Sequence, residues 1–396
     1  MAIAKKIQQY MHSASWIRGM FEEGIRLKQM HGEDQVFDFS LGNPIMEPPA
    51  PFYEALSELI QQPLPGMHRY MPNAGYPATR SAIAQQLAGE TGLAFTADHI
   101  VMVVGAAGGL NVVLKTLLDP GDEVVIFSPY FVEYHFYVDN HQGVIKVTPT
   151  DAQFNLDLHA LEQNLSPKTK VVLINSPNNP SGVLYSSATL KALGELLDRK
   201  QTEFNRQIFL LSDEPYKKLL YDGLTYPEIY QTYDNSIAVT SHAKDLALPG
   251  ERIGYIATHP ACADVAALQD GFSFTNRTLG FVNAPALMQH VVIRLQGVTI
   301  DVAQYERKRD LFCAALQDMG YELVRPQGAF YIFPRSPIED DVAFVQALQQ
   351  KRILTVPGSG FGTPGHFRIA YCVEDRTIEN AIAGFREVAK QYGLRT

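Results

Sequence analysis

The chain has 396 residues, of which 46% are hydrophobic and 19% charged, and its formal net charge is -9. These values are typical of a globular protein with more than one domain, and they exclude a disordered or fibrous chain. The acidic balance argues against nucleic-acid binding, which depends on lysine and arginine. Three widely spaced cysteines fit a reducing compartment and give no zinc motif, and no apolar leader or membrane span is visible. We expect a cytoplasmic protein without metal, membrane or nucleic-acid partners.

Short apolar runs recur along the chain and are separated by amphipathic segments with helical spacing. Continuous apolar strands that alternate with helices indicate a mostly parallel sheet covered by helices on both faces. We therefore predict an α/β fold whose large domain spans residues 46–285. The runs lie at residues 100–104, 123–127, 170–174, 208–211, 236–240 and 252–258.

The pattern changes from about residue 286. Residues 285–320 read as one long helix, short strands follow near 328–334 and 366–371, and a helix ends the chain. The first 45 residues, which end in "FDFSLGNP", are too few for a domain of their own and are expected to pack on this region. We predict a smaller α+β domain formed by residues 1–45 and 286–396.

Polar or small residues follow four of the predicted strands, at the edge where open parallel sheets bind ligands. After the first run comes "GAAGGLN", residues 105–111, whose small residues let backbone N–H groups approach a phosphate at a helix start. An ordinary strand-to-helix turn would look the same. After the third comes "NSPNNPSG", residues 175–182, where Asn179 can aim its amide at a ligand oxygen, although the segment also suits a plain turn.

The two next strands are followed by groups with acid, base or nucleophile chemistry. "SDEPY" contains Asp213 and Tyr216, and the alternative for the carboxylate is a helix N-cap. "SHAKDLALPGERIGY" contains Ser241, Lys244 and Arg252. A lone lysine is ordinarily solvated, whereas an arginine offers two parallel N–H groups to a phosphate. A further motif, "GFGTPG" at residues 360–365, matches a dinucleotide-binding pattern but precedes a strand, so we predict a loop.

Taken together, the motifs resemble the fold-type I pyridoxal-phosphate (PLP) enzymes, and within them the class I aminotransferases related to aspartate aminotransferase. The resemblance runs from "SLGNP" at about residue 40 to the C-terminus. It implies a large domain with a mostly parallel seven-stranded sheet, PLP as cofactor, and a homodimer with shared active sites.

The resemblance also implies roles for individual residues at the cofactor ring. Lys244 is similar to the lysine that forms an aldimine with the cofactor aldehyde and later shuttles a proton. Asp213 resembles the carboxylate that pairs with the pyridine nitrogen and keeps it protonated. Tyr216 and Asn179 resemble the donors to the phenolic oxygen. Phe131 stands where an aromatic ring stacks on the pyridine, and many relatives carry a larger ring there.

Further positions resemble the residues that bind phosphate and substrate. Ser241, Arg252 and the backbone at Ala106 and Ala107 would hold the phosphate, joined by Tyr70 from the neighbouring subunit. Arg368, in "HFRIAY", resembles the arginine that binds the substrate α-carboxylate, and the substrate pocket would be completed by Gly42, Asn179 and Phe330. Arg277 is a candidate for a distal carboxylate only by its position in the chain, and a solvated or interface arginine is the alternative.

The leading hypothesis is a ping-pong aminotransferase that moves an amino group from an α-amino acid to a 2-oxo acid. A β-lyase, or related carbanion chemistry on the same cofactor, is the alternative, because such enzymes share the anchoring residues. A regulatory module that binds without turnover is a third reading, but no basic helix-turn-helix pattern precedes the motifs. Aspartate or glutamate are plausible donors, while aromatic, branched and sulfur amino acids stay open.

Overall fold

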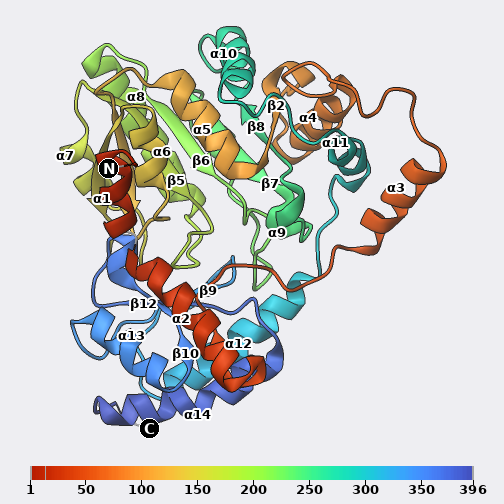
Figure 1. Cartoon of the computed structure of the whole chain (residues 1–396). Helices are drawn as coiled ribbons and strands as arrows, with labels where there is room; N and C mark the ends of the chain where they lie inside the picture. The colour runs from red at the N-terminus through yellow and green to blue at the C-terminus, as the bar shows by residue number, and fades with distance from the viewer. Residues whose placement is uncertain (1, 14, 395–396) are drawn as a thin grey trace.

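The computed structural model describes residues 2–13 and 15–394. Its centre is a seven-stranded sheet in the order β2-β8-β7-β6-β5-β3-β4 (Figure 1). The strands are parallel except for β8, which pairs antiparallel with both neighbours. The predicted α/β fold with a mostly parallel seven-stranded sheet is confirmed. The strands are Ile100–Val103 (β2), Glu123–Ser128 (β3), Val144–Pro149 (β4), Thr169–Asn175 (β5), Phe209–Asp213 (β6), Ser236–Ser241 (β7) and Gly254–Thr258 (β8).

Helices cover both faces of this sheet, because successive side chains along each strand point to opposite apolar layers. Val171 and Leu173 of β5 pack in one layer, and Val172 and Ile174 pack in the other. The first layer contains α5 (Gly105–Leu117), α6 (Tyr134–Asn140) and α10 (Val265–Thr278). The second contains α3 (Ala50–Gln61), α4 (Pro77–Thr91), α7 (Leu158–Asn164), α8 (Ser187–Phe204) and α11 (Ala286–Val292).

A second apolar core lies below the large sheet in the view of Figure 1. It is built around a three-stranded sheet, β11-β12-β9, and a two-stranded sheet, β1-β10. Phe39, Phe312 and Phe385 are fully buried in it and contact one another. Its elements are β1 (Phe37–Asp38), α12 (Val302–Asp318), β9 (Tyr331–Ile332), α13 (Asp341–Gln350), β10 (Ile353–Leu354), β11 (Val356–Pro357), β12 (Phe367–Ala370) and α14 (Asp375–Gln391).

The N-terminal segment contacts both cores. β1 pairs in parallel with β10, so the stretch after residue 36 joins the smaller core. α2 (Ser15–His31) is tied to the same region by an ion pair of 2.8 Å between Lys28 and Asp38. α1 (Lys5–Ser13) instead lies beside α6, where the rings of Tyr10 and Phe136 are 5.0 Å apart (Figure 1).

The prediction of one continuous helix over residues 285–320 is wrong. α11 ends at Val292, a 3₁₀ turn follows, and α12 begins only at Val302. Gly297 in the connecting segment has φ +77°, a left-handed conformation that glycine adopts without steric cost and that ends a helix. The 3₁₀ turns are Glu33–Gln35 (η1), Ala97–His99 (η2), Ile229–Gln231 (η3), Pro249–Glu251 (η4), Ile293–Leu295 (η5) and Gly358–Phe361 (η6).

The "GFGTPG" segment begins in η6 and leads into the strand β12, so it is a loop and not a strand-to-helix turn. Across residues 2–13 and 15–394, no helix combines the length and the apolar character needed to cross a membrane.

Candidate functional site

Lys244 lies at the carboxyl edge of the large sheet. It belongs to the short helix α9 (His242–Asp245), which follows Ser241, the last residue of β7. Its Nζ donates a hydrogen bond of 2.6 Å to the carbonyl oxygen of Gly42 and lies 5.4 Å from the ring centre of Phe330. Burial lowers the pKa of this amine to about 8, because removal from water disfavours the charged form. A fraction of Lys244 is therefore the neutral, nucleophilic amine near neutral pH.

Asp213 is the last residue of β6, the strand between β5 and β7, and it does not cap a helix. The carboxylate is buried, and its Oδ2 accepts a hydrogen bond of 2.7 Å from the Tyr134 hydroxyl. Its Oδ1 is buried without a partner. Burial raises the pKa of Asp213 to about 7, although the Tyr134 hydrogen bond opposes the shift. A cation that met Oδ1 would therefore keep Asp213 ionised.

Two phenols of the smaller core, Tyr216 and Tyr331, contact each other, and Tyr216 follows Asp213 by three residues. The hydroxyls of Tyr216 and Tyr331 are 2.8 Å apart, and the ring of Tyr216 packs edge-on against Phe330 with centres 5.4 Å apart. Burial raises the pKa of Tyr331 to about 12 and that of Tyr216 well above its ordinary value. Both phenols are therefore neutral donors at physiological pH. Gly42 packs on this pair, because a β-carbon there would overlap the Tyr331 hydroxyl.

Arg368 points from β12 toward the same edge of the sheet. Its Nη1 donates to Asn179 Oδ1 at 3.1 Å, and its Nη2 donates to the carbonyl oxygen of Ser40 at 2.6 Å. The guanidinium lies between the rings of Tyr331 and Phe361, whose centres are 4.9 Å and 4.8 Å away. Its Nε is buried without a partner, and burial lowers the pKa of Arg368. The group is thus a fixed cation with unused hydrogen-bonding capacity, suited to a carboxylate.

The start of α5 and Arg252 form a second cationic corner. The first helical residues, Gly105, Ala106 and Ala107, present the backbone N–H groups that an α-helix leaves unpaired at its start. Arg252 donates from Nη1 to the carbonyl oxygen of Pro249 at 2.9 Å and from Nη2 to the carbonyl oxygen of the residue that precedes α5, at 3.4 Å. Gly105 has φ +78°, and a β-carbon there would lie 2.9 Å from Arg252 Nη2. The helix dipole and the guanidinium together favour an anion.

Three predicted residues lie elsewhere or at the margin of this group. Phe131 precedes α6 and packs against Tyr134, with ring centres 5.6 Å apart. Tyr70 is 91% exposed in the single chain. Arg277 is exposed on α10 and stacks on the ring of Phe274 at 5.4 Å, as the solvated or interface alternative expects.

Sequence reasoning assigned no role to Tyr134, Tyr331 or Asn175. The Asn175 amide donates a hydrogen bond of 2.8 Å to the backbone carbonyl of Asp213, and its Oδ1 accepts one of 2.7 Å from the backbone N–H of Asn179. Asn175 therefore joins the ends of β5 and β6. Asn175 stood inside a motif singled out as polar, and Tyr331 is adjacent to Phe330. Tyr134 carried no such signal.

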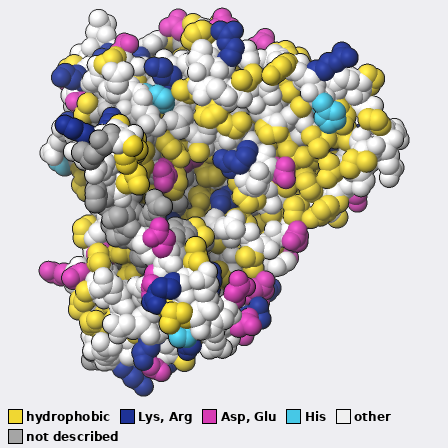
Figure 2. Space-filling model, in the orientation of Figure 1, with side chains coloured by type: hydrophobic (Ala, Val, Ile, Leu, Met, Phe, Trp, Pro, Cys, Tyr) yellow, Lys and Arg dark blue, Asp and Glu magenta, His cyan; other side chains and the backbone are white. Residues whose placement is uncertain are grey.

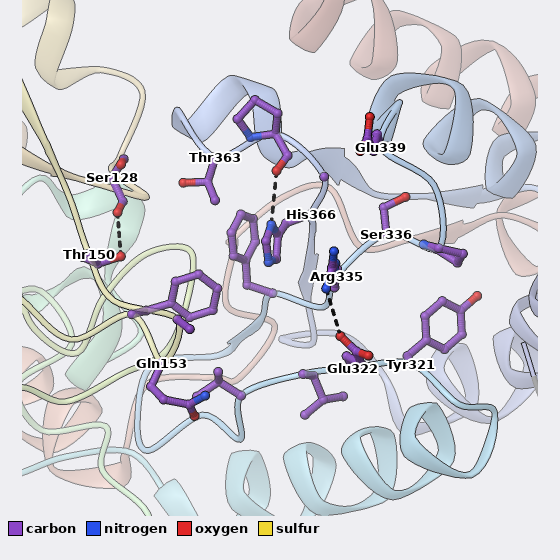
Figure 3. Close-up of a pocket in the computed structure, with 18 of the residues that line it drawn as sticks. Ser128, Thr150, Gln153, Tyr321, Glu322, Arg335, Ser336, Glu339, Thr363 and His366 are labelled. Carbon is purple, nitrogen blue, oxygen red and sulfur yellow. Dashed lines mark hydrogen bonds and ion pairs between the residues drawn. The ribbon is translucent and has the colours of Figure 1, made fainter.

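A cavity of about 1220 Å³ lies away from this group of residues (Figure 3). It is formed by Ser128 and residues 149–154 on one side and by residues 320–324, 335–339 and 362–366 on the other. His366 lies flat on Phe333 within it, with ring centres 5.2 Å apart. None of the predicted site residues lines this cavity, and no lining atom is among the described buried polar side-chain atoms without a partner. The predicted residues that the structure brings together therefore lie around Lys244 at the edge of the sheet and not in this cavity.

Known proteins are similar to this chain in sequence and in fold. Residues 34–385 match the family model described as "Aminotransferase class I and II". A "Probable aspartate aminotransferase" of Methanocaldococcus jannaschii is 31% identical over 89% of this chain and 92% of its own. An "Aromatic-amino-acid aminotransferase 2" of Thermococcus litoralis is 28% identical over the whole of both chains. A solved amino transferase from Eubacterium rectale has a TM-score of 0.96 and 37% identity, covering 99% of this chain and 100% of its own.

Proposed function

This chain belongs to the class I and II aminotransferases, and from that premise we propose that Lys244 binds PLP covalently and that the residues around it carry out transamination. The enzyme is an aminotransferase that moves an amino group from an α-amino acid to a 2-oxo acid. The β-lyase alternative is not favoured, because the relatives reported above are named aminotransferases.

The observation that carries this proposal is a pair of buried polar atoms without partners, Asp213 Oδ1 and Arg368 Nε. An unpaired buried polar group costs on the order of 1–3 kcal/mol, and more if it is charged. The protonated pyridine nitrogen of PLP would satisfy the first atom, and a substrate carboxylate would satisfy the second. The free N–H groups of α5 with Arg252 would take the phosphate, so the residues present fit the cofactor at both ends.

When bound, PLP supplies an electron sink for the charge that develops at the substrate α-carbon. Asp213 would hold the ring nitrogen in its protonated form. Tyr216 and the free amide nitrogen of Asn179 would donate hydrogen bonds to the ring oxygen, since Asn179 Oδ1 already accepts from Arg368. Ser241 would add a hydroxyl at the phosphate, and Phe131 would cover one face of the ring. These contacts would position the cofactor beside Lys244 Nζ.

Lys244 would then act as the base that moves a proton from the substrate α-carbon. Its pKa of about 8 makes the neutral amine accessible near pH 7, at which an unshifted lysine would be almost fully charged. Arg368 would orient the substrate through its α-carboxylate, and Gly42 and Phe330 would close the pocket around Nζ. The substrate is therefore an α-amino acid with a free carboxylate. Relatives are named for aspartate and for aromatic donors, so the side chain is left to experiment.

The organisation of the whole molecule is also a proposal. We assign a large PLP-binding domain to residues 46–285 and a small domain to 1–45 and 286–396. The separate apolar cores support this division, except that α11 packs on the large sheet and so favours a boundary nearer to α12. The exposed Tyr70 supports a homodimer in which this phenol reaches the phosphate site of the partner. Three free, buried cysteines support a reducing, cytoplasmic setting.

The test is absorbance spectroscopy of the purified protein with PLP. We expect a band of covalently bound cofactor that changes when the correct amino acid is added, and a half-reaction screen of the twenty amino acids identifies that donor. Lys244→Ala should lose the band and at least about 10³-fold in kcat, because it removes both the covalent anchor and the base. Lys191→Ala, on the exposed face of α8, is the matched control and should behave as wild type. Absence of any PLP band in the wild-type protein would refute the proposal.

A further inference from the structure

The helix that carries Lys244 is too short to hold its own position. α9 has four residues, His242–Asp245, whereas isolated helices in water need about 12–15 residues to be even marginally stable. Leu246 caps the C-terminus of α9, and the next residue, Ala247, has φ +53°, so the chain leaves α9 through a conformation that is unfavourable for a residue other than glycine. Contacts from other elements must therefore fix the position of Lys244.

A cluster of polar side chains, Asp245, His242 and Lys218, supplies such contacts on α9. Oδ2 of Asp245, the residue after Lys244, lies 3.2 Å from His242 Nδ1 and 3.2 Å from Lys218 Nζ. His242 and Asp245 are almost fully buried. Burial raises the pKa of Asp245, but His242 and Lys218 outweigh it and the pKa lies below its ordinary value, so the carboxylate is ionised. The cluster thus joins both ends of α9 to the segment that follows β6.

The same aspartate fastens α9 to the segment that leads into the smaller core. The backbone carbonyl of Asp245 accepts two hydrogen bonds, one of 2.8 Å from the Ile300 N–H and one of 3.0 Å from the Thr299 hydroxyl. Lys218 Nζ, besides meeting Asp245, donates 3.4 Å to the carbonyl oxygen of Val298. Residues 298–300 directly precede α12, which belongs to the smaller core together with β12, the strand of Arg368. The lysine and the substrate-binding arginine are therefore mechanically linked through this segment.

We propose that Asp245, with His242 and Lys218, is a positioning group that holds Lys244 in register with the segment 298–300, and so with the domain that carries Arg368. The inference rests on the proposed function of Lys244 as the PLP-binding lysine.

The cluster is not what packing for stability alone would select. Asp245 Oδ1 and His242 Nε2 are both buried without a hydrogen-bond partner. Each such atom costs on the order of 1–3 kcal/mol, and apolar side chains of similar volume would avoid that cost. A directional, charged contact, unlike an apolar one, fixes the orientation of the element that bears it.

The first test is the kinetics of two variants of the PLP-loaded enzyme, Asp245→Asn and Lys218→Met. Asp245→Asn keeps the size of the side chain but removes its charge. Lys218→Met breaks the same ion pair by removing the ammonium of the more exposed partner, so the test stands even if Asp245→Asn misfolds. We expect kcat to fall about 10- to 100-fold, the cost of misplacing a reacting group by about 1 Å. KM for the amino donor should stay within about twofold, because Arg368 still binds its carboxylate. A fall in kcat with an unchanged KM distinguishes a positioning role from a general loss of stability.

The second test follows the Lys244 amine itself and needs no turnover. Brief acetylation of the cofactor-free protein with acetic anhydride, read by mass spectrometry, measures how readily Nζ is reached relative to the exposed Lys191. We expect Lys244 to be labelled about threefold faster or more in Asp245→Asn and Lys218→Met, because a loosened α9 opens more often.

The control is Asp222→Asn, which breaks a more exposed carboxylate pair with Arg309, at 2.6 and 2.8 Å, in the same stretch of chain but away from α9. Asp222 has φ +56°, which asparagine tolerates well. It should lower thermal stability without changing kcat or Lys244 labelling. If both test variants behave like this control, the inference is wrong while the proposed function stands. If the wild-type enzyme binds no PLP, the proposed function fails, and the labelling rates alone decide whether Asp245 positions Lys244.

Discussion

At the scale of single residues, burial acts on Lys244 and Asp213 in the same physical sense. It favours the neutral form of each, so the pKa of the lysine falls to about 8 and that of the aspartate rises to about 7. A neutral lysine is useful for chemistry, whereas a neutral aspartate cannot pair with a cationic ring nitrogen. On the proposed function, the protonated ring nitrogen of bound PLP would restore the charge of Asp213.

The first prediction concerns the pH dependence of stability in the cofactor-free protein. The pKa of Asp213 is about 7 in the folded state and about 4 in the unfolded chain, so the folded state binds the proton more tightly. The stability that Asp213 contributes is fully present below about pH 4 and is lost as pH rises toward 7. The free energy of unfolding of wild type minus that of Asp213→Asn should therefore fall by about 3 kcal/mol between pH 4.5 and 7.5.

Urea denaturation at both pH values checks this, and groups common to both proteins cancel in the difference. Asp222→Asn is the control, because Arg309 lowers the pKa of Asp222 and its contribution is lost only as pH falls through that lowered value. A difference for Asp213→Asn that does not change with pH would contradict the raised pKa.

The second prediction concerns Tyr134, the donor to Asp213 Oδ2. Tyr134→Phe keeps the ring in its apolar layer and removes the hydroxyl, leaving an ionised, buried carboxylate without that hydrogen bond. The variant should lose about 1–3 kcal/mol of unfolding free energy at pH 8, and less at pH 5, where Asp213 is protonated. It should also bind PLP more weakly. Equal destabilisation at both pH values would show that the hydroxyl does not act through the charge of Asp213.

At the scale of elements, the cationic corner formed by Arg252 and the start of α5, where we propose that phosphate binds, depends on how the chain enters α5. Gly105 starts the helix with a left-handed backbone, and the space where its side chain would stand is taken by the Arg252 guanidinium. Arg252 itself has φ +52° and ends the turn η4. A left-handed glycine, which is unstrained, and a left-handed arginine, which is not, thus bring a cation and the unpaired N–H groups of a helix to one point. On the proposed function, a bound phosphate would offset the strain at Arg252.

The third prediction separates crowding at this corner from backbone strain. Gly105→Ala should raise the Kd for PLP about tenfold or more, because its β-carbon displaces Arg252 Nη2 in addition to straining φ +78°. Gly121→Ala is the matched control: φ is +91°, but nothing lies within 4 Å of the added carbon. It should lose similar stability and keep PLP affinity. Equilibrium titration of PLP fluorescence measures both. An equal loss of affinity in the two variants would remove Arg252 from the phosphate site.

What the sequence could predict follows from the range of the interactions involved. The apolar runs and the polar residues after them are local patterns, so the sheet, its covered faces and the strand-end positions of Asp213 and Lys244 were predictable. Tyr134 could not be found this way, because its contact with Asp213 joins residues 79 positions apart. The break between α11 and α12 was missed because the apolar spacing continues through Gly297, and a single glycine inside such a pattern does not by itself show that its backbone is left-handed.

At the scale of the whole molecule, the face seen in Figure 2 carries hydrophobic side chains over α3, α4 and α11. Large apolar patches on a folded chain mark surfaces that bind a partner. Several exposed side chains come from one stretch of sequence that includes Tyr70, so a second copy docked there would bring this phenol toward a neighbouring site. They are Leu41, Ile45, Tyr53, Ile60, Leu64 and Tyr70.

The last prediction asks which subunit uses Tyr70. Tyr70→Ala and Lys244→Ala subunits, each nearly inactive alone, are unfolded together in equal amounts, refolded with PLP and assayed. If Tyr70 acts across a two-fold interface, each hybrid dimer contains one site with an intact Lys244 from one subunit and an intact Tyr70 from the other. Half of the dimers are hybrids, so about a quarter of wild-type activity should return. If Tyr70 serves its own subunit, no hybrid site has both residues and activity stays at the level of the separate variants, because mixing cannot reunite groups within one chain. A mixture of Lys191→Ala and Lys244→Ala subunits, which should give about half of wild-type activity, calibrates the yield of refolded dimer.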